Sequence, residues 1–296
     1  MASDARHPGW TGRLAVVALA LLWGLNWPAV RVALTEIPPW TLRTAGLALA
    51  AAALFALAAV RGRSLRVPEG RRLALAFAGL LNIAGFNVMT AFAQLHTATS
   101  RAAIVTFTMP LFATAFAFLV LREVPDRVQR IGLGLGTLGL GVLLYPLAGG
   151  LGIPLGVAFS LGAALSWAAG TVFLKRARIQ AEPLAIAAWQ LVAGASAAGL
   201  GMLAFEGLVQ PFPLSGPVIV ALAYHVVLAQ ALAYFLWFEV VARLPAGTAA
   251  LGTLGIPVVG VLGAMLLLGE RPTVPDLIGF ALILAAAATV LLPRRR

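Results

Sequence analysis

The sequence predicts an all-α integral membrane protein with ten transmembrane helices, arranged as two inverted five-helix repeats around a central cavity. Three observations carry this prediction: an apolar composition, a regular series of apolar segments and an internal repeat. Of the 296 residues, 61% are hydrophobic and 10% are charged, whereas soluble domains carry roughly 25% charged residues. So few charges cannot cover a water-facing surface, and much of the chain must therefore face lipid.

The apolar residues fall into ten segments, and a helical crossing of a bilayer needs about 20 such residues. The expected spans cover residues 14–34, 40–60, 73–95, 102–121, 131–147, 153–174, 184–205, 217–242, 248–268 and 277–292. Two of them, 131–147 and 277–292, are shorter than 20 residues, so some helices should be short or broken. The first segment follows two arginines, as a secretory signal would. It continues to about Leu34, however, and we expect an uncleaved helix.

The basic residues are distributed unevenly between the loops. If the N-terminus is inside, 17 of the 21 Lys and Arg residues lie at the inner ends of spans, and only Arg31, Arg43, Arg101 and Arg271 do not. Cytoplasmic loops retain Lys and Arg. We therefore expect a multi-pass protein of the bacterial inner membrane with both termini cytoplasmic, which requires an even number of spans.

An internal repeat divides the chain into residues 1–147 and 148–296, two five-helix halves of one transmembrane domain. Residues 97–144 align without gaps to residues 244–291 with 13 identities over 48 positions, including Pro110 with Pro257 and Glu123 with Glu270. Because five spans are an odd number, the second copy enters the membrane upside down. Inverted repeats with a substrate site at their interface are a recurring transporter architecture.

Particular stretches resemble a known family. These are RLPAGTAALGTLGIPVVGVLGAMLLLGERPT over residues 243–273, its weaker copy before Glu123, WGLNW in the first span and Arg43 early in the second. Together they resemble the drug/metabolite transporter superfamily, specifically its EamA-type members, over nearly the whole chain. The resemblance implies ten helices around a central cavity. It also implies transport, often export, of amino acids or related small metabolites, without fixing the substrate.

The third and eighth expected spans each carry a stripe of polar or amphipathic side chains on one helical face. The stripes are Asn87, Thr90 and Gln94, and Gln230, Tyr234 and Trp237. The repeat pairs Asn87 with Tyr234 and Thr90 with Trp237, so the same face is polar in both halves. Amides facing lipid are costly. The stripes therefore predict either cavity lining or hydrogen bonds between helices.

Other candidate cavity residues come from the first, second, fourth, sixth and seventh spans. They are Trp23, Asn26, Trp27, Arg43, Thr106, Trp167 and Gln190. A shift of 144 residues places Trp167 opposite Trp23, and both lie near mid-span, which argues against an interfacial aromatic belt. Arg43, the counterpart of Gln190, could extend its charge to the membrane surface. Alternatively, it could be a gate residue or bind a substrate carboxylate.

Pro110 and Pro257 fall inside the fourth and ninth spans. Proline removes a backbone donor and clashes with the preceding turn, so both should kink their helices, either as hinges or as static bends. His225 is the only histidine within a span. It is either a hydrogen-bonded packing residue or a site of proton exchange.

Several function classes are excluded or disfavoured. The chain contains no cysteine, so no disulfide or thiol nucleophile is possible. Gly134-x-Gly136-x-x-Gly139 resembles a dinucleotide fingerprint, but it lies in an apolar span and lacks the preceding strand that this motif needs. The basic residues form short clusters and no continuous basic face, which argues against nucleic acid. We expect no cofactor, no metal, no enzymatic activity and no obligate protein partner.

The sequence thus predicts a secondary transporter of small neutral or zwitterionic metabolites, most of all amino acids, working by alternating access as an exporter or facilitator. No Asp or Glu lies near the middle of a span, whereas proton-driven transporters usually carry an ionisable relay there. The alternatives are a channel for small solutes and a proton-coupled drug/metabolite antiporter that uses His225. The partners expected are the small-molecule substrate and the lipid bilayer.

Overall fold

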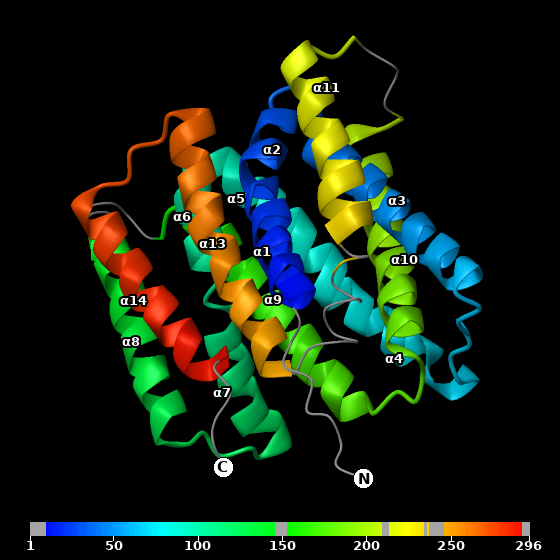
Figure 1. Cartoon of the computed structure of the whole chain (residues 1–296), viewed down its shortest axis with the longest axis horizontal. Helices are drawn as coiled ribbons and strands as arrows, with labels where there is room; N and C mark the ends of the chain where they lie inside the picture. The colour runs from blue at the N-terminus through cyan, green and yellow to red at the C-terminus, as the bar shows by residue number, and fades with distance from the viewer. Residues whose placement is uncertain (1–9, 146–152, 209–212, 234–235, 237–245, 292–296) are drawn as a thin grey trace.

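The protein is all helical over the residues described by this computed structural model, which are 10–145, 153–208, 213–233, 236 and 246–291 (Figure 1). The first half comprises α1 (Trp10–Gly24), α2 (Asn26–Ala33), α3 (Pro39–Val60), η1 (Glu69–Arg71), α4 (Arg72–Gly79), η2 (Leu80–Gly85), α5 (Phe86–His96), α6 (Thr99–Thr106), α7 (Met109–Leu121) and α8 (Arg127–Leu144). The second half comprises α9 (Leu155–Ala177), α10 (Pro183–Gly201), η4 (Met202–Glu206), α11 (Gly216–Ala223), η5 (Tyr224–Leu232), α13 (Ala246–Leu268) and α14 (Val274–Leu291).

Six helical stretches are long and apolar enough to cross a membrane, among the residues described. They are Leu14–Ala33, Pro39–Val60, Glu69–His96, Thr99–Leu121, Leu155–Ala177 and Pro183–Phe205. Shorter apolar helices cover Gly216–Gln230, Gly255–Leu268 and Val274–Thr289, and α8 occupies the remaining expected span. An all-helical membrane fold is therefore confirmed, whereas the number of ten spans stays a prediction.

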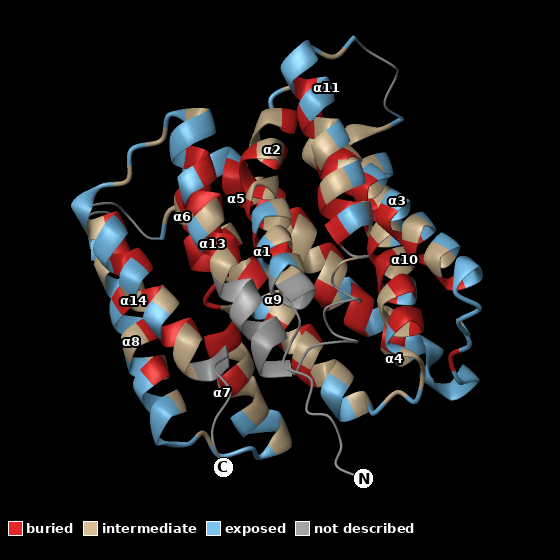
Figure 2. Ribbon diagram, viewed as in Figure 1, coloured by how far each residue is buried: buried red, intermediate tan, exposed pale blue. Residues whose placement is uncertain are grey.

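Many residues on the outer faces of the helices are exposed (Figure 2), and a large number of them are large and apolar. Leu200, Val220 and Leu266 are 69%, 70% and 83% exposed and all lie on expected membrane helices. In water such a surface would be an aggregation hazard. Against hydrocarbon it is the required surface, because backbone polar groups are already paired within the helices.

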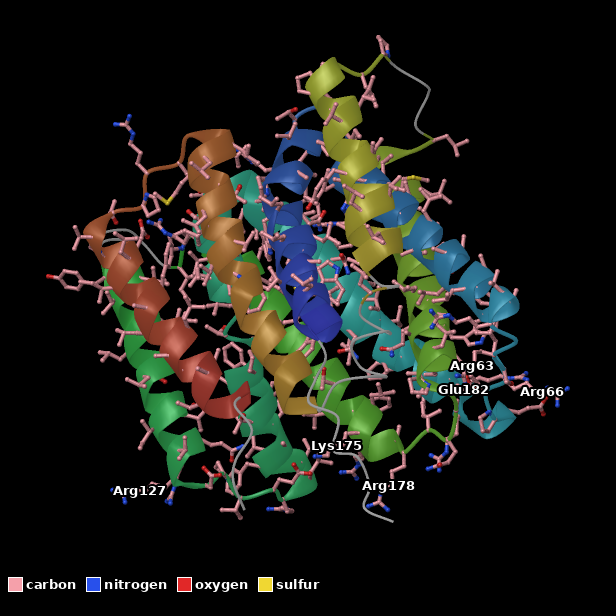
Figure 3. The ribbon with its side chains drawn as sticks, viewed as in Figure 1. Arg63, Arg66, Arg127, Lys175, Arg178 and Glu182 are labelled. Atoms are coloured by element: carbon pink, nitrogen blue, oxygen red, sulfur yellow. The ribbon has the colours of Figure 1, made fainter. Side chains whose placement is uncertain are left out.

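The ends of the helices form two chemically different faces. One, the basic face, contains the start of α1, the end of α14 and the links α3–α4, α7–α8 and α9–α10, where Arg63, Arg66, Arg127, Lys175 and Arg178 project outward (Figure 3). The opposite face contains the links α2–α3, α5–α6 and α13–α14 (Figure 1). The basic loops thus lie together at one end of the helices, and the side of the membrane that this end faces stays a prediction.

Carboxylates on the opposite face, here called the capped face, bind helix starts of the other half. Glu206 accepts hydrogen bonds from the Trp40 and Thr41 amides at 2.8 and 2.7 Å, at the start of α3. Glu270 accepts from the Thr99 and Ser100 amides at 2.6 and 2.9 Å, at the start of α6. The first amides of a helix lack partners within it and favour negative charge, so these contacts join the halves.

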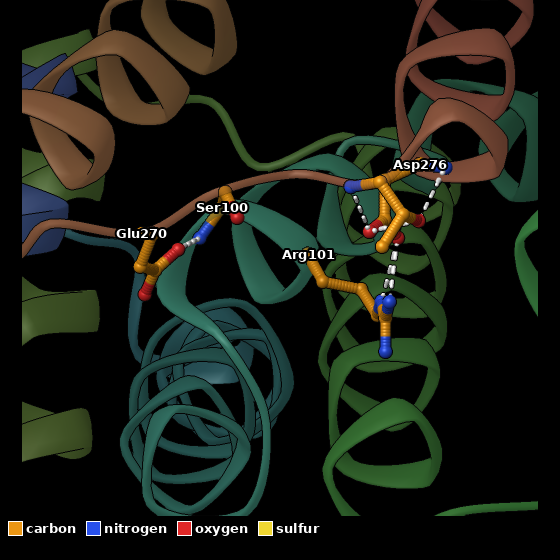
Figure 4. A network of polar contacts seen from close by, with 5 residues as sticks. Ser100, Arg101, Glu270 and Asp276 are labelled. Carbon is orange, nitrogen blue, oxygen red and sulfur yellow. Dashed lines mark hydrogen bonds and ion pairs between the residues drawn. The ribbon is translucent and has the colours of Figure 1, made fainter.

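Two more polar contacts reinforce the capped face. Arg101 of α6 binds Asp276 of α14, with Nη2 and Oδ1 2.6 Å apart, beside the Glu270–Ser100 contact (Figure 4). Glu36 accepts from the Ser215 amide at 2.8 Å, just before α11. Hydrogen bonds from the Ser215 side chain and backbone hold the pKa of the Glu36 carboxyl below its usual range. Its contact is therefore lost only when the pH falls through that lowered pKa.

Two of the expected spans are broken beside a proline. Pro28 lies four residues after Gly24, where α1 ends, and Pro110 lies four residues after Thr106, where α6 ends. Proline cannot donate a hydrogen bond to the carbonyl four residues earlier, so each preceding helix stops there. In the second half, Pro257 lies inside the continuous helix α13.

The third and eighth spans each contain a π-helical segment. These are η2 (Leu80–Gly85) and η5 (Tyr224–Leu232). The repeat shift of 147 residues maps 80–85 onto 227–232, so the widened turns occupy equivalent places in the two halves. π-helical turns inside α-helices occur frequently at functional sites.

Glycines let α8 and α14 approach closely. A Cβ on Gly139 would lie 2.9 Å from Ile283 Cγ1 and 3.1 Å from the Gly279 carbonyl oxygen. Gly139 is the third glycine of the dinucleotide-like motif, and in the structure it serves helix packing. Lipid provides no hydrophobic force between helices, and close packing of small residues contributes much of their association.

Gly139→Ala should lower the thermal unfolding temperature of the detergent-solubilised protein, because overpacking costs about 1–3 kcal/mol. Gly134→Ala is the matched control in the same helix, since a Cβ there meets nothing within 4 Å. The control should unfold at the wild-type temperature or slightly above it. Equal unfolding temperatures for the two variants would contradict this account of the α8–α14 contact.

Candidate functional site

A buried guanidinium lies near the centre of the helix assembly. Arg43 of α3 is 4% exposed, and its Nη2 donates to Thr90 Oγ1 of α5 at 3.3 Å. Thr90 in turn donates to the Asn87 carbonyl oxygen at 2.9 Å. The sequence left open whether Arg43 reaches the membrane surface. Its burial places it inside the protein, in contact with a residue of the predicted polar stripe.

His225 of η5 packs against α3, one turn after Arg43. The imidazole is fully buried in η5, and its Nδ1 is 2.8 Å from Asn26 Oδ1 at the start of α2. Its Nε2 lies over Gly46, one turn after Arg43, where a Cβ would be only 2.6 Å away. With the amide oxygen facing Nδ1, that nitrogen donates and Nε2 is left as an acceptor.

Several buried polar side-chain atoms have no hydrogen-bond partner among the described residues. Arg43 Nε is a donor, whereas Gln94 Oε1 and His225 Nε2 are acceptors; Thr106 Oγ1 and Thr99 Oγ1 are also unpartnered. Gln94 lies one turn after Thr90 on α5. Buried polar groups are nearly always paired, and exceptions call for an explanation. Three of the predicted cavity residues and His225 are such exceptions.

Gln190 belongs to a second polar cluster. Its Oε1 accepts from Asn82 Nδ2 at 3.1 Å, and Asn82 Oδ1 accepts from Thr171 Oγ1 at 3.2 Å. Gly170 leaves room for the Asn82 side chain, since a Cβ at this glycine would lie 2.5 Å from Asn82 Oδ1. These bonds join η2, α9 and α10. Asn82 was not among the predicted cavity residues, although an amide near the middle of an apolar span is itself a signal.

The tryptophans occupy different environments. Trp23 is half-buried and its Nε1 donates to the Ala229 carbonyl oxygen at 3.0 Å, which links α1 to η5 next to Gln230. Trp27 is buried against Ala93, Ala102 and Ala103. Trp167 is half-buried on α9.

The remaining candidates are placed as follows. Asn87 is half-buried, and its amide donates to the Ile83 carbonyl oxygen of its own helix at 2.9 Å. Gln230 is 8% exposed. Tyr234 and Trp237 lie outside the described residues. Pro110 is the second residue of α7, and Pro257 is buried within α13.

The site contains no cluster of metal ligands. Among the residues described, no three His, Asp or Glu side chains are placed to hold an ion. Its chemistry is that of hydrogen bonding around one fixed positive charge. Such an arrangement can bind and release a small polar solute.

Asn26→Ala should lower the unfolding temperature, because it leaves the buried His225 Nδ1 unpaired at a cost of about 1–3 kcal/mol. Asn87→Ala is the control, since it removes an amide of similar exposure that bonds only to its own helix. The control should unfold closer to the wild-type temperature. If Asn87→Ala is the more damaging variant, the Asn26–His225 contact is not a main support of this region.

Comparison with known proteins assigns the fold and the family. The EamA-like transporter family matches residues 10–145 and again 154–292. An uncharacterized transporter of Bacillus subtilis, YvbV, is 28% identical over 94% of this chain and 90% of its own. A "Probable amino-acid metabolite efflux pump" of Salmonella typhimurium is 28% identical over 95% of this chain and 93% of its own.

One solved crystal structure matches the architecture, with a TM-score of 0.64 and 24% identity over 94% of this chain and 96% of that chain. At that identity the likeness concerns the fold alone. The two family matches together span most of the chain and fall one in each half, as the internal repeat predicts. The chain therefore belongs to the EamA-like transporter family.

Proposed function

We propose that this transporter moves small zwitterionic metabolites, amino acids foremost, by alternating access, with Arg43 at the centre of the substrate site. The observation that carries the proposal is the buried Arg43 Nε, which has no partner among the described residues, while the acceptors Gln94 Oε1 and His225 Nε2, on helices that contact α3, also lack one. A substrate carboxylate would accept from Arg43 in a charge-assisted hydrogen bond. The substrate ammonium would donate to Gln94 Oε1 or His225 Nε2.

The charge balance favours this class of substrate over others. A phosphate or polyanion would want several basic groups at membrane depth, whereas Arg43 is the only buried arginine among the described residues. A cation without a carboxylate would have to bind beside that guanidinium with no acid to compensate. A zwitterion brings one charge of each sign and leaves the site's net charge unchanged. The printed name of the Salmonella relative supports the same class.

Alternating access would require the capped face to open. Glu206 and Glu270 each hold a helix start of the opposite half, so opening would exchange these bonds for bonds to water. With the capped face closed, access would lie on the basic face. The site would then load from that side first.

Two mechanisms of energy coupling are compared for this site: transport down the substrate's own gradient and proton antiport. We favour a facilitator or exchanger that runs down the substrate's own gradient, which points outward in a producing cell. His225 supports the alternative of proton antiport, because it is the titratable partner of Arg43 in the site. A protonated His225 imidazole would repel the adjacent Arg43 guanidinium, and this repulsion argues against proton antiport. Accumulation driven by a preset pH gradient and abolished by His225→Ala would reverse this preference.

The transport prediction is tested in proteoliposomes by counterflow of radiolabelled amino acids. Wild-type protein should show saturable counterflow. Arg43→Gln should reduce its efficiency by at least about tenfold, since a hydrogen bond to a charged group contributes about 1.5–3 kcal/mol. Arg43→Lys should retain part of the activity. Arg127→Gln, on the exposed basic face, is the control and should transport normally.

Competition experiments separate substrate binding from a merely structural effect of Arg43. The matching decarboxylated amine should compete weakly with the amino acid in wild-type protein, and the Arg43→Gln variant should discriminate less between the two. Unsaturable flux without counterflow would instead indicate a channel. Preferential transport of sugar phosphates would contradict the substrate class.

The basic face should be cytoplasmic, because 17 of the 21 basic residues lie at the inner ends of spans in that orientation. We accordingly propose a bacterial inner-membrane location with both termini inside. A periplasm-active reporter fused after Arg296 should give no signal, whereas the same reporter inserted between α13 and α14 should give a strong one. The reverse pattern would overturn the topology.

A further inference from the structure

A cavity of about 660 Å³ lies between α4 and α10 at the basic face. The segment Leu65–Val67, which precedes α4, forms part of its wall. Trp189 of α10 is fixed there, because its Nε1 donates to the Leu65 carbonyl oxygen at 2.9 Å and its ring meets Phe55 edge-on at 5.3 Å. This groove is separate from the Arg43 site, and none of the predicted cavity residues lines it.

The groove changes from basic to apolar along its length. Arg66 and Arg72 lie at its mouth, and Leu75 and Ala76 lie one turn further along α4. Val192 and Ala193 line its inner part; they follow the start of α10 by nine and ten residues, roughly 14 Å along the helix axis at 1.5 Å per residue. At the inner end α4 touches α10, since a Cβ on Gly79 would lie 2.9 Å from Ala193 Cβ.

The charges at the mouth are available for an anion. Both arginines are exposed. Arg72 is 3.5 Å from Glu69, but these side chains are 64% and 88% exposed, and such surface pairs contribute little. No Asp or Glu lines the groove. Its mouth therefore carries two positive charges, followed by a channel of aliphatic carbons.

We propose that this groove binds an anionic phospholipid. Its phosphate would lie between Arg66 and Arg72, and part of one acyl chain would lie along Ala76, Val192 and Ala193. Basic pockets between membrane helices on the cytoplasmic side bind anionic lipid head groups, and guanidinium groups match phosphate geometry. A free phosphate would contact only the two arginines at the mouth of the groove. The apolar inner part of the groove fits the acyl chain of an amphiphile. The proposal does not depend on the transported substrate.

The probe is native mass spectrometry of the full chain in a neutral detergent, titrated with phosphatidylglycerol or phosphatidylcholine. Wild-type protein should bind one phosphatidylglycerol saturably and more tightly than phosphatidylcholine. The double variant Arg66→Gln/Arg72→Gln should bind it roughly 30-fold more weakly, about fivefold for each arginine near an anionic lipid surface. The control Arg127→Gln/Arg178→Gln removes equal charge from exposed positions on the same face and should bind as wild type.

A second variant tests the acyl chain. Ala76→Phe fills the groove without altering its charge and should also abolish the tight site, with the unfolding temperature confirming an intact fold. Equal loss in both arginine double variants, or equal binding of the two lipids, would overturn the proposal as non-specific attraction. Unchanged phosphatidylglycerol binding by Ala76→Phe would overturn it as well. Binding of inorganic phosphate alone, lost in Arg66→Gln/Arg72→Gln but not in Ala76→Phe, would assign the mouth to a free anion.

Discussion

The burial of the Arg43 charge is the constraint around which the centre of this protein is arranged. Removing an ion from water costs several kcal/mol even after the surroundings relax, and the surrounding bilayer offers no compensation. Thr90 provides one acceptor, and helix interruptions lie close by. α1 gives way to α2 next to Asn26, and the π-helical η5 places His225 over Gly46. Irregular backbone is tolerated at membrane depth where protein or a cavity surrounds it.

Outside this centre, two kinds of contact hold the helices together where hydrophobic force is absent. Within the bilayer, small residues such as Gly139 and Gly79 bring helix backbones into contact. At the capped face, charged side chains bind free helix starts across the two halves. Among the described residues, the links at the basic face are weaker: the Lys175–Glu123 pair is 2.6 Å long, but its side chains are 61% and 49% exposed. This difference makes the capped face the firmer closure.

The sequence was sufficient for the helical membrane fold, for the family and for the concentration of basic loops at one end, since these follow from composition and from the spacing of apolar residues. Side-chain pairing was less predictable. The repeat matched Arg43 with Gln190, yet Gln190 bonds to Asn82 in a different cluster, because pairing depends on neighbours supplied by distant spans. Pro110 and Pro257 also correspond in sequence. Only Pro110 lies at a helix break, whereas Pro257 lies inside the continuous helix α13. That helix packs against α1 and α2 through Gly255, Gly260 and Gly263.

The helix caps on the capped face carry a consequence for biosynthesis. Glu206 and Glu270 belong to the second half, but the helix starts that they satisfy, at α3 and α6, belong to the first. A ribosome therefore delivers α3 and α6 to the membrane well before their caps exist. Until then, the amides of Trp40, Thr41, Thr99 and Ser100 must rely on water. The first half therefore reaches its final structure only once the chain has been synthesised beyond residue 270.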